Sequence, residues 1–288
     1  MQILRRFSRR QIIIGATAAG LLLLAAGLSV YQIGFRKPVG TPTLVVRPAK
    51  TAIALDPWDA TWKKVSAVTM PLTITSTPGA KARDVSVKAV TDGTNLAVRM
   101  EWADGAKDVT TLRPQDFGDQ AAIQLSDQVS NACMGQVGMN PVHIWQWKAD
   151  WQFGSRDMKT QFPNIINDGF HDDTGKALLT EDLYARPAFV AGNARAAEAK
   201  DKPVESLIAE GFGTLTSAGA HPMQSKGDYQ NGRWAVVFMR PLQGETGDVS
   251  LTAGAPLQAA FAVWDGQFMQ RDGMKYTTSW VVLQLEGK

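Results

Sequence analysis

Residues 85–102 read VSVKAVTDGTNLAVRMEW, and this stretch indicates the class of fold. Two runs rich in β-branched and apolar residues flank the segment TDGTN at 91–95, which is typical of a tight hairpin turn. In the second run the large apolar side chains fall on alternate positions: Leu96, Val98, Met100 and Trp102. Alternate side chains of a strand point to the same face. The stretch therefore predicts two antiparallel strands with one face turned to a core.

Similar strand-like runs recur along the chain. They cover residues 85–90, 96–102, 121–126, 142–151, 233–240, 257–265 and 276–285. Glycine, aspartate, asparagine and proline separate these runs, and no helical pattern alternates with them. The spacing predicts a mainly β fold, an antiparallel β-sandwich, in one domain over residues 51–288.

The stretch 152–232 has a different composition, with few strand-like runs and frequent glycine, aspartate, proline and alanine. Within it, residues 194–199 and 204–209 are predicted as short helices. Because a stretch of this length is too long for a simple connection, we expect a loop and helical insertion that folds over the sandwich.

The charge of the chain is divided unevenly. Residues 1–55 carry eight basic groups and no acidic one, while the rest of the chain holds 22 basic and 27 acidic groups, a net charge of −5. The formal charge of +3 therefore does not indicate a nucleic-acid-binding surface. A single cysteine excludes a disulfide framework, a cysteine-based zinc or iron–sulfur site and a Cys-x-x-Cys-His haem attachment.

The N-terminal segment 1–35 is predicted to be an export signal and membrane anchor. Residues 11–35 contain no charged side chain, and a helix of this length can cross a hydrocarbon core of about 30 Å. Four arginines precede this run, so residues 1–10 are expected in the cytoplasm and the C-terminal domain in a bacterial periplasm. The segment SRRQIII at 8–14 resembles a twin-arginine signal. We favour a retained single-pass transmembrane helix over cleavage, followed by a proline-rich linker at 36–50.

The usual signatures of catalysis are missing from the sequence. The three histidines are too widely separated for metal-ligand spacing, no serine or cysteine lies in a nucleophile elbow, and no glycine-rich phosphate loop follows a strand. Residues 139–151 instead read MNPVHIWQWKADW, with Trp145, Trp147 and Trp151 at odd-numbered positions. A large aromatic core explains buried tryptophans, but it does not explain the methionines Met134 and Met139 at the entrance to the same strand.

At these residues the chain resembles the haem-binding gamma subunits of the ethylbenzene dehydrogenase and dimethylsulfide dehydrogenase group, which serve molybdenum enzymes of the dimethylsulfoxide reductase superfamily. The resemblance is carried by DPW at 56–58, FGDQAAIQ at 117–124, MG at 134–135, PVHIWQWKAD at 141–150, AEGFGTLT at 209–216, and WDG through GMK to tryptophan at 264–280. It spans nearly all of the expected exported part.

The resemblance implies a β-sandwich that holds one non-covalent b-type haem between its sheets, with a methionine and a lysine as axial ligands of the iron. By position these are Met134 and Lys275, with Met139 and Met274 as alternatives to Met134. Without the resemblance, Lys275 would be interpreted as a solvated turn lysine beside Arg271 and Asp272. Trp145, Trp147 and Trp264 either line the haem pocket or fill the core, and the sequence does not separate these two roles.

The resemblance also implies that the chain is not itself an enzyme but an electron-transfer subunit. Its partners would be iron–sulfur and molybdenum catalytic subunits, and its membrane anchor adds a quinone-linked protein or a mobile cytochrome. Two alternatives from other classes are a cofactor-free, carbohydrate-type binding module and an anchored scaffold. The binding module predicts solvent-exposed aromatic side chains and no colour.

Overall fold

The computed structural model describes residues 41–74, 83–127, 134–135, 141–154, 164, 202–219, 221–244 and 248–286. These residues fall almost entirely in the compact unit 42–288. The segment 1–35, the helix predicted at 194–199, Cys133 and Met139 lie outside the described residues. Along the part of the chain that is described, no helix is both long and apolar enough to cross a membrane.

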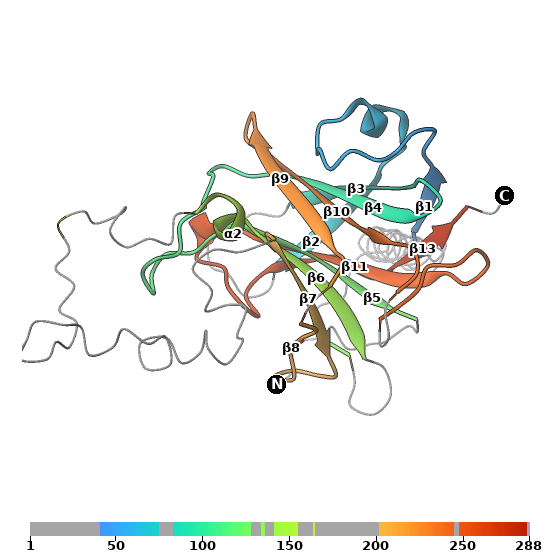
Figure 1. Ribbon diagram of the computed structural model, residues 1–288. Coiled ribbons are helices and arrows are strands. Elements are labelled where there is room, and N and C mark those ends of the chain that lie inside the picture. Colours follow the sequence, from blue (N-terminus) through green and yellow to red (C-terminus); the bar gives the residue numbers. More distant parts are fainter. Residues whose placement is uncertain are drawn as a thin grey trace, which may run out of the picture. The chain divides into compact units, whose positions relative to one another are not determined.

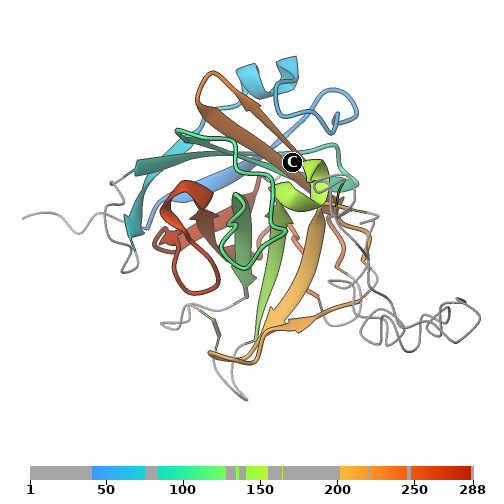
Figure 2. The same cartoon turned by 90° about the vertical axis from the view of Figure 1, so that its left-hand side faces the viewer.

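Two β-sheets stack against each other, as the layers in Figures 1 and 2 show. The central strands of the first sheet are β7 (Val204–Ala209), β6 (Val142–Lys148), β5 (Gln120–Ser126) and β11 (Leu257–Trp264), all antiparallel neighbours in that order. The short strand β8 (Thr216–Ser217) borders β7, and β12 (Tyr276–Thr277) and β13 (Val281–Leu285) share the other side of β11. The second sheet has the order β2 (Val68–Ile74), β3 (Arg83–Thr91), β4 (Asn95–Ala103), β10 (Arg233–Pro241) and β9 (Gln224–Gln230). The predicted antiparallel β-sandwich is confirmed.

The two sheets are joined where β12 pairs with β2 and also by strand β1 (Thr43–Pro48). Its first residues pair in parallel with β13, and Arg47 and Pro48 pair with β3. The prediction assigned these residues to the linker at 36–50, because three prolines lie there. The alternation of Leu44 and Val46, both buried, explains why the segment is a strand of the sandwich instead.

The space between the sheets is filled by a core of large side chains. Trp147 of β6 meets Trp234 of β10 edge-on, with ring centroids 5.0 Å apart, and Trp102 of β4 stacks on Trp234 at 6.5 Å. Gly227 of β9 packs so closely on the Trp147 ring that a Cβ at this position would overlap it. The close fit leaves the tryptophans fully buried.

Two further predictions about secondary structure are wrong. Residues 204–209, predicted as a helix, form β7, whose two faces are both buried, so that its sequence lacks the alternation typical of strands. The run predicted to extend to Trp151 ends at Lys148, and the short helix α2 (Ala149–Phe153) follows. Trp151 therefore does not share the strand face of Trp145 and Trp147. The 3-10 turns are Ala60–Lys64 and Gly266–Phe268.

Candidate functional site

A cavity of about 440 Å³ lies against the outer face of the first sheet, the face turned away from the sandwich core. It is lined by alternate residues of three adjacent strands: Gln120, Ala122 and Gln124 of β5, Ile144, Gln146 and Lys148 of β6, and Ala260, Ala262 and Trp264 of β11. The residues between them, such as Ile123, Trp145 and Val263, belong to the core on the opposite face. The strand alternation thus separates cavity residues from core residues.

The middle of the cavity floor is apolar and its side chains are small. Ala122, Ala260 and Ala262 lie on neighbouring strands, and Ile144 and Leu207 extend this surface toward β7. Glutamines border the floor, and Gln146 Nε2 donates a hydrogen bond of 2.6 Å to Gln120 Oε1. An apolar floor with a few polar groups at its edge is typical of sites for flat organic ligands and cofactors.

Met134 lies on the β7 side of the cavity. Its side chain packs against the outer-face cluster that includes Leu207 and Ile144. Its carbonyl oxygen accepts a hydrogen bond of 2.8 Å from the amide of Gly211, which follows β7. A weakly basic thioether, held in place through the backbone, therefore lines the cavity.

Lys275 lies on the other side of the floor, just before β12, which pairs with β11. Its Nζ donates to the carbonyl oxygen of Asp272 at 3.2 Å and lies 5.3 Å from the centre of the Trp264 ring. The indole Nε1 of Trp264 donates to the same carbonyl at 3.1 Å. Since β7 and β11 flank β5 and β6, Met134 and Lys275 line opposite sides of one cavity.

The second lysine of the cavity, Lys148, is part of a buried ion pair. Its Nζ lies 2.6 Å from a carboxylate oxygen of Glu205 on β7 and 4.0 Å from the centre of the Trp151 ring. Both partners of the pair are more than nine-tenths buried. Removing either partner would leave the other buried without its counter-charge, so the Nζ of Lys148 is directed to Glu205 on β7.

Of the three tryptophans expected at the haem pocket, one lines the cavity and two lie in the core. Trp264 lines the cavity, whereas Trp145 and Trp147 lie in the core on the other face of the sheet. Met274 has 45% of its surface exposed and is not among the cavity residues. This cavity lies on the outer face of the first sheet, whereas the resemblance implies a haem between the sheets, where the described residues form a core of buried large side chains.

Several cavity residues were not identified from the sequence. Phe212, Leu215, Leu207 and Lys148 all line it. Alternation within 120–124 and 144–148 could have grouped the strand residues by face, because the tryptophan-rich face is the better candidate for the core. No local pattern indicates that residues near 134, 212 and 275 converge.

A separate cluster of carboxylates lies at the ends of β4, β5 and β11. Asp104, Asp119 and Asp265 are buried, and one oxygen from each lies within 4.8 Å of the others. Burial and the neighbouring charge of Asp104 raise the pKa of Asp119 to about 8. Burial and the charge of Asp265 raise the pKa of Asp104 to about 6.

The hydrogen-bond partners of this cluster indicate a structural network. The guanidinium of Arg83 pairs with Asp265 at 2.7 Å. Asp119 accepts from the indole of Trp234 at 2.9 Å and from the amides of Asp108 and Gly266. Carboxylate oxygens suit hard cations such as Ca²⁺, and in this structure Arg83, the Trp234 indole and backbone amides contact the carboxylates of Asp265 and Asp119.

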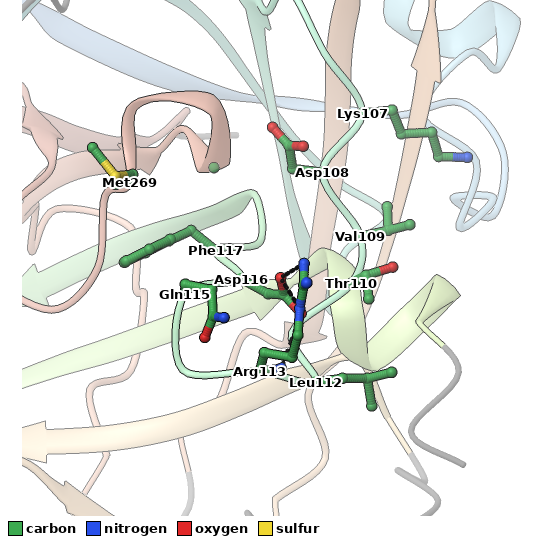
Figure 3. A pocket seen from close by; sticks show the side chains of 11 residues that line it. Lys107, Asp108, Val109, Thr110, Leu112, Arg113, Gln115, Asp116, Phe117 and Met269 are labelled. Carbon is green, nitrogen blue, oxygen red and sulfur yellow. Dashed lines mark hydrogen bonds and ion pairs between the residues drawn. The ribbon is translucent and has the colours of Figure 1, made fainter. Parts of the chain in front are cut away.

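A second cavity of about 530 Å³ opens beside the carboxylate cluster, and Figure 3 shows its lining side chains. Arg113 and Asp116 form a bidentate pair at its edge, with a shortest distance of 2.7 Å. Asp108 and Gly266 line it as well. Its lining is mainly polar and contains neither Met134 nor Lys275.

The fold and the cavity define a β-sandwich domain with a cavity on the outer face of one sheet, lined by a methionine and a lysine on opposite sides. Comparison with known proteins gives the family of this domain. The family model described as ethylbenzene dehydrogenase matches residues 58–276. The chain belongs to this family.

Three relatives are similar to this chain over most of their own length. One, from Haloferax mediterranei, is named as a respiratory nitrate reductase heme subunit and is 26% identical, over 92% of this chain and 82% of the relative. The dimethylsulfide dehydrogenase subunit gamma of Rhodovulum sulfidophilum is 25% identical, over 94% and 91%. The chlorate reductase subunit gamma of Ideonella dechloratans is 25% identical, over 78% and 77%.

Among solved structures, a family 9 carbohydrate-binding module from Caldicellulosiruptor kristjanssonii in complex with glucose aligns with a TM-score of 0.44 and 11% identity. The alignment covers 85% of this chain and 96% of the module.

Proposed function

We propose that this chain is a b-type cytochrome subunit that binds one haem in the outer-face cavity and transfers electrons to or from a molybdenum oxidoreductase. The observation that carries the proposal is the placement of Met134 and Lys275 on opposite sides of one cavity in a member of this family. One relative is named as a heme subunit of a reductase, and two are named as gamma subunits. The bound haem would supply one-electron chemistry at its iron.

The residues of the cavity fit a haem. A volume of about 440 Å³ is within the range of cofactor sites, about 300–1,000 Å³. The alanines of the floor leave room for a flat macrocycle, and the glutamines and Arg271 at the edge suit its carboxylate groups. With one cysteine in the chain, the macrocycle is held by ligation and packing, which is the meaning of a b-type haem.

The two ligands would act on the iron in different ways. The thioether of Met134 is a soft, neutral donor that favours ferrous iron and raises the reduction potential. Lys275 can bind only as a free amine, so iron competes with the proton for Nζ. The Trp264 ring and the Asp272 carbonyl hold Nζ at the cavity.

The location and the partners of the subunit form part of the same proposal. The uncharged run at 11–35 after four arginines supports a single-pass anchor with the sandwich in the periplasm, and SRRQIII supports export by the twin-arginine route. An iron–sulfur subunit would connect the haem to the molybdenum subunit. A quinone-linked protein or a mobile cytochrome would exchange electrons at the membrane surface.

The experiment is an optical spectrum of the full chain, purified in detergent from haem-replete cells. We expect a reduced-minus-oxidised b-type band and one haem per chain by pyridine haemochrome. Met134→Ala and Lys275→Ala should each change the spectrum. The matched controls are Met269→Ala and Lys226→Ala, which remove an exposed methionine and an exposed lysine outside this cavity.

A colourless wild-type protein would overturn the proposal and favour a cofactor-free module. An unchanged spectrum in both ligand variants would overturn the ligand assignment alone. The carbohydrate-type alternative expects exposed aromatic side chains. All nine tryptophans are described and are buried or half-buried, whereas Phe212 and Phe153 are exposed, so the spectrum and not the exposure of aromatic side chains separates the two functions.

A further inference from the structure

The turn after β7 presents an apolar surface that the fold of the chain alone does not explain. Phe212 has 79% of its surface exposed and Leu215 has 41%, yet both line the outer-face cavity. Exposing a phenylalanine to water is unfavourable relative to burying it. An exposed side chain of this kind at the edge of an apolar cavity indicates a surface that a ligand covers.

The conformation of this turn is fixed by its own hydrogen bonds. Thr214 Oγ1 accepts from the amide of Glu210 and donates to the carbonyl oxygen of Gly211, each at 2.8 Å. Gly211 and Gly213 have φ angles of 136° and 82°, a region that other residues rarely adopt. Phe212 is therefore held at the cavity by a defined turn.

The same turn is joined directly to Met134. The amide of Gly211, whose carbonyl is held by Thr214, donates the 2.8 Å hydrogen bond to the carbonyl oxygen of Met134. A displacement of the turn would therefore move the backbone that carries the thioether. Two hydrogen bonds therefore connect Thr214 to Met134: one from Thr214 to the Gly211 carbonyl, and one from the Gly211 amide to the Met134 carbonyl.

We propose that residues 211–215 form the second apolar wall of the cavity: Phe212 and Leu215 contact the porphyrin, and Thr214 is a positioning residue that fixes Met134 through Gly211. The inference rests on the proposed function, since it takes the cavity to be a haem site. It adds contact residues on the methionine side, where the floor strands provide only Ile144 and Leu207.

The contact is tested by the rate at which the haem-loaded full chain transfers haem to an excess of myoglobin apoprotein. Phe212→Ala should release haem about 10- to 100-fold faster than the wild type, because the variant loses the contact of a phenylalanine with the ligand. Leu215→Ala should show a smaller increase, about 3- to 10-fold. Phe153→Ala removes another exposed phenylalanine, outside the cavity, and should stay within about twofold of the wild type.

Release from Phe212→Ala within twofold of the wild type would overturn the contact while leaving the proposed function intact. A wild-type chain that holds no haem would instead overturn the proposed function, and the two failures are therefore distinguishable. A melting curve for each variant shows that it is folded, and substitutions on this exposed turn should leave the melting temperature close to that of the wild type.

The positioning role is tested with Thr214→Val and Thr214→Ser. Valine keeps the shape but removes the hydroxyl, so we expect a weaker near-infrared band of methionine-ligated ferric haem and a lower reduction potential. Serine keeps the hydroxyl and should restore both. An unchanged band and potential in Thr214→Val would overturn the role of Thr214.

Discussion

The two faces of the first sheet are built from the same strands but have opposite properties. The inner face carries Trp145, Trp147 and Phe261, which fill the sandwich completely. The outer face carries alanines and glutamines at the intervening positions, which leave the cavity of about 440 Å³. The difference teaches that side-chain size, assigned by strand alternation, determines which face supplies stability and which supplies a site.

The largest effect is expected when the inner face is broken. Trp147→Ala should lower the free energy of unfolding by about 3–5 kcal/mol, because a fully buried tryptophan leaves a cavity beside Trp234. Urea unfolding followed by circular dichroism measures the change. The neighbouring Gln146→Ala alters the outer face and should cost less than about 1 kcal/mol. Equal costs for the two variants would contradict the division between faces.

Filling the cavity on the outer face should lower haem affinity strongly and change the free energy of unfolding little. Ala262→Phe places a large ring on the cavity floor, where Ala262 is only partly buried. We expect haem affinity to fall about 100-fold, equivalent to about 2.7 kcal/mol, while stability changes by less than about 1 kcal/mol. Haem titration of the protein and urea unfolding give the two numbers.

Ala262→Ser is the matched control, since it adds one polar atom without filling the cavity. It should keep the affinity within a few-fold of the wild type. An Ala262→Phe variant that binds haem as the wild type does would mean that the ligand lies elsewhere.

The sequence predicted seven strand-like runs, of which six match one strand each and the run 276–285 covers both β12 and β13. It missed β1 and β2, which contain prolines, and it failed where a strand has little contrast between its faces. Strand β7 is buried on both sides, and Glu205 is buried there only because Lys148 pairs with it. Strand β9, with the sequence QSKGDYQ, has mostly polar residues and is a strand because it pairs with β10.

The site was less predictable than the fold for a related reason. Met134 and Lys275 came from the family resemblance, and no local pattern relates them, because 141 positions of chain separate them. The sequence left two roles open for the tryptophans of β6, the haem pocket or the core, and the structure places them in the core. The size of the tryptophans in β6 indicates which of its faces meets the core, whereas the approach of Met134 and Lys275 to one cavity depends on packing between segments far apart in the chain.

The buried carboxylates Asp104, Asp119 and Asp265 lie apart from both faces of the first sheet, and they should make the free energy of unfolding depend on pH. The pKa of Asp119 is raised to about 8 from 3.8, so the folded state binds a proton that the unfolded state releases above pH 4. Stability should therefore be highest below about pH 4 for this group and fall as pH rises to 8, by up to about 1.4 kcal/mol per pH unit.

Asp119→Asn tests this pH dependence. An amide resembles the protonated acid, so the variant should fold and should lose part of the slope between pH 5 and 8, measured by urea unfolding at several pH values. The raised pKa of Asp104, about 6, supports a residual slope below pH 6. A slope equal to that of the wild type would show that Asp119 is ionised in the folded protein.

The smallest expected effect comes from replacing the tryptophan of the outer face, Trp264, by phenylalanine, compared with the same substitution on the inner face. Trp264→Phe keeps an aromatic ring at the cavity but removes the hydrogen bond to the Asp272 carbonyl, which also accepts from Lys275. We expect a cost of about 0.5–1.5 kcal/mol in stability and a change in the haem spectrum. Trp147→Phe is the matched substitution on the inner face, where the ring lies 5.0 Å from Trp234, and it should lower stability without a change in the spectrum. If both variants leave the spectrum unchanged, Trp264 lines the cavity without influencing the ligand.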